Sequence, residues 1–282
     1  MTRRRELLER IATLGEIDGI MIAMKNMARV EAHRLAGFLD KQRRAVGMIE
    51  AAAADFLGFH GELRARAEPA SDIRLLIGSE RGFCGDFNAA LHEHVRRHPQ
   101  ALAGGGPVVV VGGRLAAKFA GDGRVAAFVD GPNVAEEVHP VLVRLVQRLR
   151  DLQHRPGGQP LLGLTALCHG GEGGEIAERR LLPLPQRPAP RFSHPPRLNL
   201  APLEFFRQLT DQYLYAVLHE VFCDSLLAEN RRRLDHMDRA LRKLDQDMAR
   251  MRLQQNRLRQ EEIIEEIEVI LLSAEALEGA RA

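Results

Sequence analysis

The feature that most constrains the fold is the C-terminal run from Pro202 to Ala282, where the only glycine is Gly279 and the only proline is the first residue. Glycine and proline interrupt helices, so we expect one long helix here. Its apolar residues recur at alternating spacings of three and four, which indicates the seam of a coiled coil. They are Leu234, Met237, Leu241, Leu244, Met248, Met251 and, after a polar Gln255, Leu258.

A matching seam runs along the N-terminal end of the chain. On a lattice of alternating steps from Leu7 to Phe56, twelve of fifteen positions are apolar. The three polar positions are Asp18, Lys25 and Gln42. Because other sequence separates the two ends, we expect them to pair as antiparallel helices. One would be roughly 80 Å long and the other more than about 100 Å, so the pair should project as a rod.

The segment between the two helices is predicted to be an α/β domain. Strands are expected at 73–77, 107–111, 125–129, 160–168 and 176–184, and helices at 86–98, 114–120 and 134–152. This alternation predicts a mainly parallel, Rossmann-like sheet with helices on its faces. The reversal from Gly170 to Gly174 should make the last pair of strands antiparallel.

These patterns divide the chain into five segments. Seven of the fourteen prolines lie between Pro183 and Pro202, which favours an extended connector there. The expected segments are an N-terminal coiled-coil helix (1–58), a linker (59–72), the central α/β domain (73–184), a proline-rich connector (185–202) and a C-terminal coiled-coil helix (203–282).

Composition restricts the class of protein. The chain has 282 residues with 45% hydrophobic and 28% charged content, which suits one or two domains with a sizeable core. We expect no membrane span and no secretory signal, because the apolar runs are short and Glu6 and Glu9 interrupt the start. The three cysteines are far apart, which favours a reducing compartment.

Two glycine-containing turns are candidates for a phosphate site. Gly78 to Gly85 follows the first expected strand, where α/β proteins place phosphate loops, but the spacing matches neither G-x-G-x-x-G nor a P-loop. Glu80 and Asp86 would also repel phosphate. Gly112-Gly113 has too few glycines for a dinucleotide turn, so structural turns are favoured at both places.

No catalytic or metal-binding group stands out. Cys84 follows Arg81 closely and could be a low-pKa thiol, but no histidine is near it in sequence, and a buried structural cysteine is favoured. The eleven histidines show neither H-x-x-x-H nor H-E-x-x-H spacing. We therefore expect no catalytic residue, no cofactor and no metal.

The last helix carries its charge in two bands. Between Arg231 and Arg259 there are ten Lys or Arg and four Asp, and an acidic band, Glu261 to Glu268, follows. The basic band could bind nucleic acid, or it could be the solvated face of a coiled coil. A third interpretation is a rod whose charges face an enclosing partner at different heights.

Four stretches resemble the gamma subunit of F-type ATP synthases. Residues 22–28 (IAMKNMA) are similar to the family's I-T-K-A-M-x-M-V-A, and residues 79–88 (SERGFCGDFN) to S-x-R-G-L-C-G-G-L-N. Residues 228–234 (AENRRRL) resemble A-S-E-x-A-x-R-M, and 256–267 (NRLRQEEIIEEI) resemble N-x-x-R-Q-x-x-I-T-x-E-I. Departures at Asp86, at Ile264 and in the triplet from Arg231 to Arg233 leave a divergent or alternate F-type ATPase open.

The resemblance implies a non-catalytic central stalk that couples ion flow to ATP synthesis or hydrolysis by rotation. It implies as partners the alpha and beta subunits of the catalytic ring, the epsilon subunit and the membrane c-ring, on the cytoplasmic face of the inner membrane. The foot and turn motif matches Arg81, Gly82, Cys84, Gly85 and Asn88. Whether protons or sodium ions move is left open.

The same resemblance places contacts between rotor and stator on six residues: Met24, Lys25, Arg233, Arg259, Gln260 and Glu266. Met24 and Arg233 match positions where the two helices touch. Lys25 lies on the seam, so we expect it to repel the nearby Arg unless acidic groups of the enclosing ring approach.

At the tip, the seam shifts past Leu258 to Ile263, Ile267, Ile270, Ala274 and Leu277. We expect a single helix there, because the N-terminal helix should not reach so far. Its apolar residues would need a cover. The resemblance supplies an apolar sleeve, in which Ile263, Ile267, Ile270 and Leu271 would form the bearing.

Two other classes of function stay open from the residues alone. One is a nucleotide- or metabolite-binding α/β module that dimerises through its terminal helices. The other is a nucleic-acid binder that uses the basic band, although the interleaved acids and the net charge of +2 argue against nucleic acid as a partner.

Overall fold

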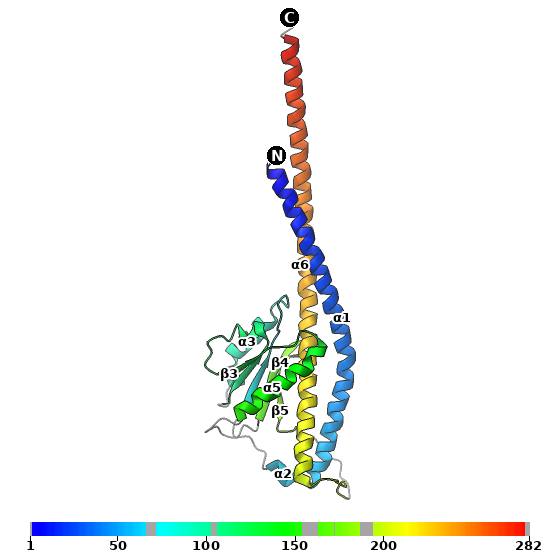
Figure 1. Cartoon of the computed structure of the whole chain (residues 1–282), viewed down its shortest axis with the longest axis vertical. Helices are drawn as coiled ribbons and strands as arrows, with labels where there is room; N and C mark the ends of the chain where they lie inside the picture. The colour runs from blue at the N-terminus through cyan, green and yellow to red at the C-terminus, as the bar shows by residue number, and fades with distance from the viewer. Residues whose placement is uncertain are drawn as a thin grey trace. The chain divides into compact units, whose positions relative to one another are not determined.

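The computed structural model describes residues 2–65, 72–102, 106–153, 163–171, 173–186 and 194–279. The chain divides into two compact units. We call residues 1–27 with 235–282 the helical unit, and residues 28–234 the mixed unit. Two long helices, α1 (Thr2–Phe59) and α6 (Pro202–Gly279), contribute to both units (Figure 1).

Both long helices follow from their sequences. α1 contains no proline. α6 has its only proline at its first position, where the fixed φ suits a helix and no hydrogen bond is lost. The only glycine of α6 is its last residue, so the helix interior holds no residue that would break it.

The predicted seams are where the two helices meet. All fifteen lattice positions from Leu7 to Phe56 are buried or half-buried, and so are the eight seam positions from Leu234 to Leu258. Inside the helical unit, Arg4 donates to Glu262 at 2.9 Å. Inside the mixed unit, the Gln42 amide donates to the Ala216 carbonyl at 2.9 Å. The antiparallel pairing is thus confirmed within each unit.

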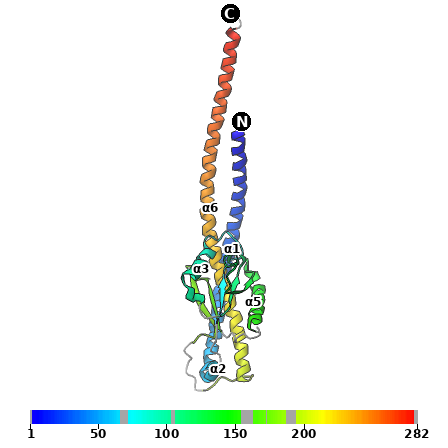
Figure 2. The same ribbon diagram turned by 90° about the vertical axis from the view of Figure 1, so that its left-hand side faces the viewer.

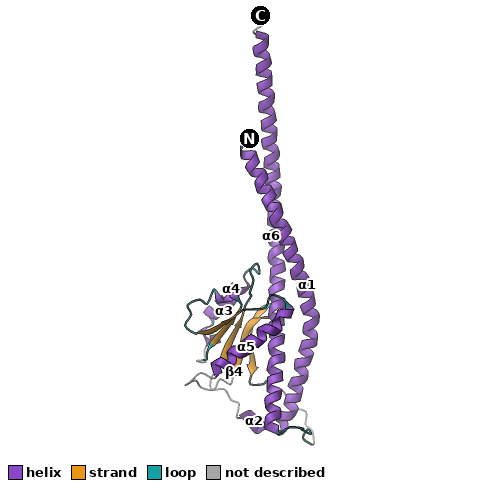
Figure 3. Ribbon diagram, in the orientation of Figure 1, coloured by secondary structure: helices purple, strands orange, loops and turns teal. Residues whose placement is uncertain are grey.

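The mixed unit contains a five-stranded sheet in the order β3-β2-β1-β4-β5 (Figure 3). The strands are β1 (Asp72–Ile77), β2 (Val108–Val111), β3 (Val125–Val129), β4 (Gly163–Gly170) and β5 (Glu175–Leu182). β1 pairs in parallel with β2 and β4, β2 pairs in parallel with β3, and β5 is antiparallel to β4. The mainly parallel sheet with an antiparallel last pair is confirmed.

The two faces of the sheet carry different helices. α5 (Val138–Gln153) covers one face together with α1 and α6 of the mixed unit, and α3 (Phe87–Arg97) and α4 (Gly113–Ala116) cover the other (Figure 2). Successive side chains of a strand point to opposite faces of the sheet, so one strand contributes to both cores. Leu75 and Ile77 face the first set of helices, whereas Leu76 faces the second. Two short 3₁₀ helices, η1 (Pro99–Leu102) and η2 (Ala135–Glu137), complete the unit.

Three expectations need correction. The linker expected at 59–72 contains a short helix, α2 (Gly61–Ala65), and residues 66–71 of it lie outside the described residues. The helix expected at 114–120 ends at Ala116. The helix expected at 134–152 begins with the 3₁₀ turn of η2. Residues 154–162, which include the start of the strand expected at 160–168, and residues 187–193 of the connector also lie outside the described residues.

Candidate functional site

The motif at residues 79–88 folds into a turn that its own polar side chains close. The Ser79 backbone N–H donates to Asn88 Oδ1 at 2.9 Å, and Asn88 Nδ2 donates to Ser79 Oγ at 2.7 Å. Ser79 Oγ donates to the Arg81 carbonyl at 2.8 Å. Both Ser79 and Asn88 are buried, so these bonds satisfy groups that water cannot reach.

Glycine is required in this turn for two reasons. Gly85 has φ of 63°, in the left-handed region that favours glycine. A Cβ at Gly78 would overlap the Leu115 side chain of α4, so the close approach of loop and helix depends on that glycine. Gly82 has neither requirement, because a Cβ there would meet only Arg114 at 3.4 Å. Phe83 shares the left-handed conformation, with φ of 63°, and its ring is exposed.

Glu80 fills the place where a nucleotide-binding α/β protein would offer backbone amides to phosphate. One oxygen of its carboxylate accepts from the N–H of Gly113 at 2.8 Å and from the N–H of Gly131 at 2.7 Å. These amides follow β2 and β3, at the carboxyl ends of parallel strands. The Glu80 carboxylate of the first glycine-containing turn is therefore hydrogen-bonded to the backbone N–H of Gly113 in the second. This bond supports a structural role, and not a phosphate-binding role, for both turns.

The three cysteines are buried and free. Burial raises the pKa of the Cys84 thiol, whose Sγ lies 3.3 Å from Ser79 Oγ. Burial also raises the pKa of Cys168 and of Cys223 to about 12. A thiol that resists ionisation is a poor nucleophile, so the burial of Cys84 favours the structural role.

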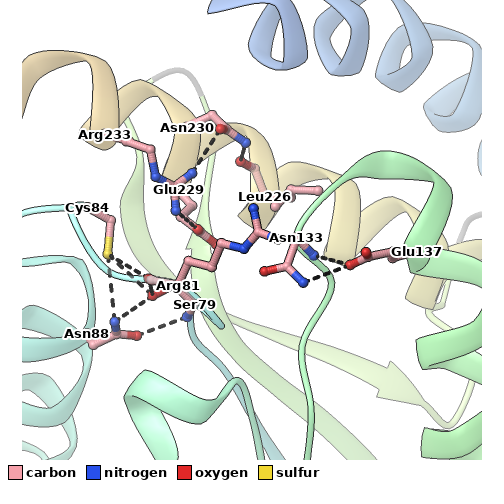
Figure 4. Close-up of polar contacts among 10 residues, drawn as sticks. All are labelled: Ser79, Arg81, Cys84, Asn88, Asn133, Glu137, Leu226, Glu229, Asn230 and Arg233. Carbon is pink, nitrogen blue, oxygen red and sulfur yellow. Dashed lines mark hydrogen bonds and ion pairs between the residues drawn. The ribbon is translucent and has the colours of Figure 1, made fainter. Parts of the chain in front are cut away.

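A buried polar group on α6, which we call the helix cluster, consists of Glu229, Asn230 and Arg233 (Figure 4). Arg233 forms an ion pair with Glu229 and donates to Asn230 Oδ1 at 2.9 Å. Asn230 Nδ2 donates to the Leu226 carbonyl at 2.9 Å. Burial raises the pKa of Glu229 to about 7, and the charge of Arg233 opposes that rise.

The helix cluster faces the motif turn. The charges of Glu229 and Arg233 act on the Cys84 thiol, and Cys84, Phe87 and Ala228 form a small apolar cluster. At the exposed rim, Arg232 donates to Asp86 at 2.6 Å. Asp86, which departs from the resembled motif, thus has a partner in the divergent arginine triplet.

Further contacts hold the sheet to both long helices in the mixed unit. Asp224 of α6 accepts from the Gly171 N–H, in the turn between β4 and β5, and pairs with Arg43 of α1 at 3.2 Å. Glu220 of α6 pairs with Arg179 of β5 at 2.7 Å. One side chain, Asp224, therefore links α1, α6 and the strand hairpin.

The residues expected to contact a stator have different environments. Arg259, Gln260 and Glu266 are exposed on α6 of the helical unit, and Met24 is half-buried. Arg233 is buried in the helix cluster. Met24 and Arg233 belong to different units, so a contact between them stays a prediction.

Lys25 corrects one expectation. It forms an ion pair with Asp238 of α6, inside its own chain. The polar gap in the seam is therefore filled without an acidic group from a partner. The sequence signal was available, because Asp238 directly follows the seam residue Met237.

The tip of α6 exposes its apolar residues. Ile263, Ile267, Ile270 and Leu271 are 45%, 50%, 64% and 59% exposed. The ion pair of Arg4 with Glu262 is made by the first turns of α1. Each described side chain from Ile263 to Leu271 is exposed, as the single-helix expectation requires. The side chains of Leu272, Ala274 and Leu277 lie outside the described residues.

Other kinds of site find little support. Among the described residues, no group of three or more His, Cys, Asp or Glu could hold a metal ion, and no helix could span a membrane. A hollow of about 440 Å³ lies between β3 and the end of α5, where the side chains of Arg148 and Asp151 pair at 3.7 Å. It is lined mainly by Ala126, Ala127, Phe128 and Leu152, away from the strand ends that bind nucleotides in α/β folds.

Sequence reasoning missed three of these residues. The sequence indicates Glu80 only as a group that would repel phosphate. It does not indicate Glu229 or Asp224 as members of a site. The only signal for Glu229 was its match to the E of the resembled A-S-E motif. For Asp224, nothing in the local pattern indicated that it would bridge three elements.

The structure combines an α/β sheet, a carboxylate at the place of a phosphate and two long helices that pair within each unit. The family model for ATP synthase matches residues 3–277. The chain therefore belongs to the ATP synthase gamma-subunit family.

Individual relatives agree with this assignment. The ATP synthase gamma chain of Bartonella tribocorum is 28% identical over 117 residues, which cover 39% of this chain and 38% of that protein. The chain thus aligns with well under half of the length of this curated relative.

Solved structures show the same fold. The rotor of the Euglena gracilis mitochondrial ATP synthase gives a TM-score of 0.60 at 12% identity, covering 93% of this chain and 99% of that chain. A second Euglena gracilis chain, from an OSCP/F1/c-ring structure, gives 0.59 at 13% identity, covering 100% and 96%. The central stalk and c-ring structure from Tetrahymena thermophila gives 0.58 at 14% identity, covering 78% and 99%.

Proposed function

We propose that this chain is the central rotor stalk of an F-type ATP synthase or ATPase. It would couple ion flow through a membrane ring to ATP synthesis or hydrolysis in a catalytic ring, and would carry no catalytic residue itself. The observation that carries the proposal is the helical unit. It is a paired shaft that ends in exposed apolar residues from Ile263 to Leu271, in a chain of the gamma family.

The exposed tip supports a bearing rather than a fixed interface. Apolar contact excludes water without selecting one angle of rotation, because it is not directional. Hydrogen bonds would select an angle, and the side chains able to make them lie just before and within the tip, at Arg259, Gln260 and Glu266. We propose that these three residues contact the catalytic ring, and that Met24 and Lys25 do so at another height.

The mixed unit supports transmission of torque. One ion pair ties β5 to α6, another ties α1 to α6, and one continuous apolar core includes the sheet and both helices. These contacts support joint rotation of the sheet and the two helices. We propose that this unit is the foot and that it binds the epsilon subunit and the c-ring, while the helical unit lies among alpha and beta subunits.

The proposed location is the cytoplasmic face of the inner membrane, with which the chain would associate only as part of the complex. The proposed division of labour follows the five segments expected from the sequence. Residues 1–58 and 203–282 would form the shaft, parts of which belong to the mixed unit, and the α/β domain at 73–184 would make the contacts of the foot. Rotation asks for torsional stiffness and an asymmetric surface, and it requires no bound nucleotide in this chain.

The alternative class, a nucleotide-binding module, is disfavoured by Glu80. A phosphate would have to displace a carboxylate that accepts two backbone N–H groups. Calorimetric titration with ATP and with NAD distinguishes the two classes, since the stalk should bind neither. Salt-sensitive retention on DNA would instead favour a nucleic-acid binder.

The experiment that tests the proposal is recovery of the assembly. The chain, tagged in its own host, should be extracted from membranes together with alpha, beta, epsilon and ring-forming subunits, in a constant ratio. Recovery of the chain alone, or as a homodimer, would refute the proposal.

A further inference from the structure

Two buried polar groups meet where the sheet contacts α6. The first is the helix cluster of Glu229, Asn230 and Arg233, and the second is the turn cluster of Ser79, Cys84 and Asn88. Each cluster satisfies its own hydrogen bonds, as Figure 4 shows. Their junction is closed by apolar contact of Cys84 and Phe87 with Ala228.

Glu229 is the negative charge at this junction. It is only 4% exposed, and a buried carboxylate needs cations close by. One cation is Arg233 on its own helix. The other is Arg81 on the turn, whose charge lowers the pKa of Glu229 and also that of Glu137 on η2. Arg81 therefore acts on an acid of the shaft and on one of the α/β domain.

The remaining charged group that faces Glu229 from the turn is Glu80, which raises the pKa of Glu229. Glu80 is itself held by the backbone N–H groups of Gly113 and Gly131. The turn is thus fixed at one end to the loops after β2 and β3, and at the other end it faces α6. A force applied at Glu229 can pass through this turn into three strands.

We propose that Glu229 is the positioning residue that locks the turn of residues 79–88 onto α6, so that the α/β domain turns with the shaft. This inference rests on the proposed rotor function. The rim pair of Arg232 and Asp86 contributes less, because Asp86 is 71% exposed at its side chain and an exposed pair is screened by water. Without the carboxylate of Glu229, buried Arg233 would lose its ion pair and keep its hydrogen bond to the amide of Asn230.

The position of the turn is measured first in the full chain, which needs no rotor activity. Spin labels at Phe83→Cys and Gln212→Cys report the distance from the turn to α6, since both native residues are exposed and the native cysteines are buried. Glu229→Gln should broaden the distance distribution. Glu229→Asp, which keeps the charge, should restore part of its sharpness.

Glu220→Gln is the matched control. It makes the same change in another buried glutamate of α6, whose arginine partner is Arg179 of β5, whereas that of Glu229 is Arg233 on α6 itself. It should leave the labelled distance sharp. Equal broadening in both variants, or none in Glu229→Gln, would overturn the lock.

The second measurement uses the assembled complex in membrane vesicles. Glu229→Gln should lower ion pumping per ATP hydrolysed by about threefold or more, with a smaller loss of hydrolysis itself. The pumping ratio of the native complex should fall with acid around pH 7, where Glu229 takes up its proton, and this step should vanish in Glu229→Gln. An unchanged ratio and an unchanged pH profile would contradict the lock.

The two measurements separate the possible failures. A broadened distance in a chain that assembles with no ATPase subunits would refute the proposed function and keep the lock. Should Glu229→Gln not fold, exposed Arg81→Gln leaves the helix cluster intact and should broaden the same distance. A sharp distance in Arg81→Gln would then refute the lock.

Discussion

The same two helices are buried differently in the two units. In the mixed unit, α1 buries Leu35, Leu39, Val46, Ala53 and Phe56 almost completely, because the sheet and α5 add to the cover that α6 provides. In the helical unit, the seam of α1 from Leu7 to Lys25 is only half-buried. Among the described seam residues of this unit, only Met237 and Met248 of α6 are buried, so the pair of helices encloses a small part of its seam.

The difference in burial gives the two units different properties. The mixed unit holds most of the apolar core and resists deformation, whereas the helical unit leaves side chains free for partners. Three polar seam residues, Asp18, Lys25 and Gln255, lie half-buried in the helical unit. The fourth, Gln42, lies in the mixed unit, where its amide donates to the Ala216 carbonyl. The mixed unit and the helical unit thus differ in how much apolar surface they bury.

The comparison predicts unequal costs for the same substitution on one helix. Leu35→Ala should lower the free energy of unfolding by about 2 to 5 kcal/mol, because it leaves a cavity in a closed core. Leu14→Ala, at a half-buried seam position, should cost about 1 kcal/mol or less. Urea unfolding followed by circular dichroism measures both, and equal losses would break the comparison.

Glu229 makes stability fall with rising pH. Its pKa of about 7 in the fold lies above the ordinary value of 4.5, so the folded chain binds more protons than the unfolded chain between those values. The free energy of unfolding should therefore decrease from about pH 4.5 to 7, by on the order of 1 to 3 kcal/mol, and then level off. Urea unfolding across this range should show the slope.

Glu229→Gln serves as the control for that slope. The difference in unfolding free energy between native chain and variant should change in this pH window and stay constant above about pH 8. A difference that does not depend on pH would mean that the pKa of Glu229 is the same in the folded and the unfolded chain.

The exposed residues of the helical unit should matter for turnover. Changing Arg259 and Gln260 together to Ala removes polar contacts to the proposed ring and should lower ATPase activity or assembly by about tenfold. Deleting residues 273–282 should leave assembly and much of the activity. Purified complexes of both variants, compared by subunit ratio and steady-state ATPase rate, decide this. The prediction would be contradicted if the truncated chain failed to assemble while the double variant assembled and hydrolysed ATP like the native chain.

A smaller effect is expected at Met24. Met24→Lys places a second cation beside Lys25, whose own charge is already paired with Asp238. Pumping per ATP hydrolysed should drop about threefold, more than hydrolysis does. Met24→Leu keeps the apolar contact and should behave as the native chain. Proton or sodium uptake by vesicles, measured beside ATPase rate, gives the ratio. Equal loss of both activities would argue against a role in coupling.

Much of the fold was predictable because its signals are local. The seams could be read from spacing alone, since each apolar residue lies near the next on one helix face. The parallel sheet followed from the alternation of short apolar runs with helical ones. The shortened α4 and the extra α2 were missed because a few residues carry too little periodicity to decide.

The site depended on contacts that sequence spacing does not encode. Glu80 lies far along the chain from Gly113 and Gly131, and its role as an internal anion appears only when three strand ends meet. The burial of Arg233 depends equally on the turn that packs over α6. From the sequence, the charge of Glu80 next to glycines suggests only that phosphate would be repelled. In the fold, the Glu80 carboxylate accepts hydrogen bonds from the backbone N–H groups of Gly113 and Gly131.

Rotation of this chain tests the account most directly. A gold particle fixed to exposed Ala89 of α3, in a complex whose alpha and beta subunits are immobilised, should turn in one direction when ATP is added. Its angular spread should increase in Glu229→Gln without a change in direction. A particle that stays still while the same complexes hydrolyse ATP would contradict the claim that this chain is the rotor.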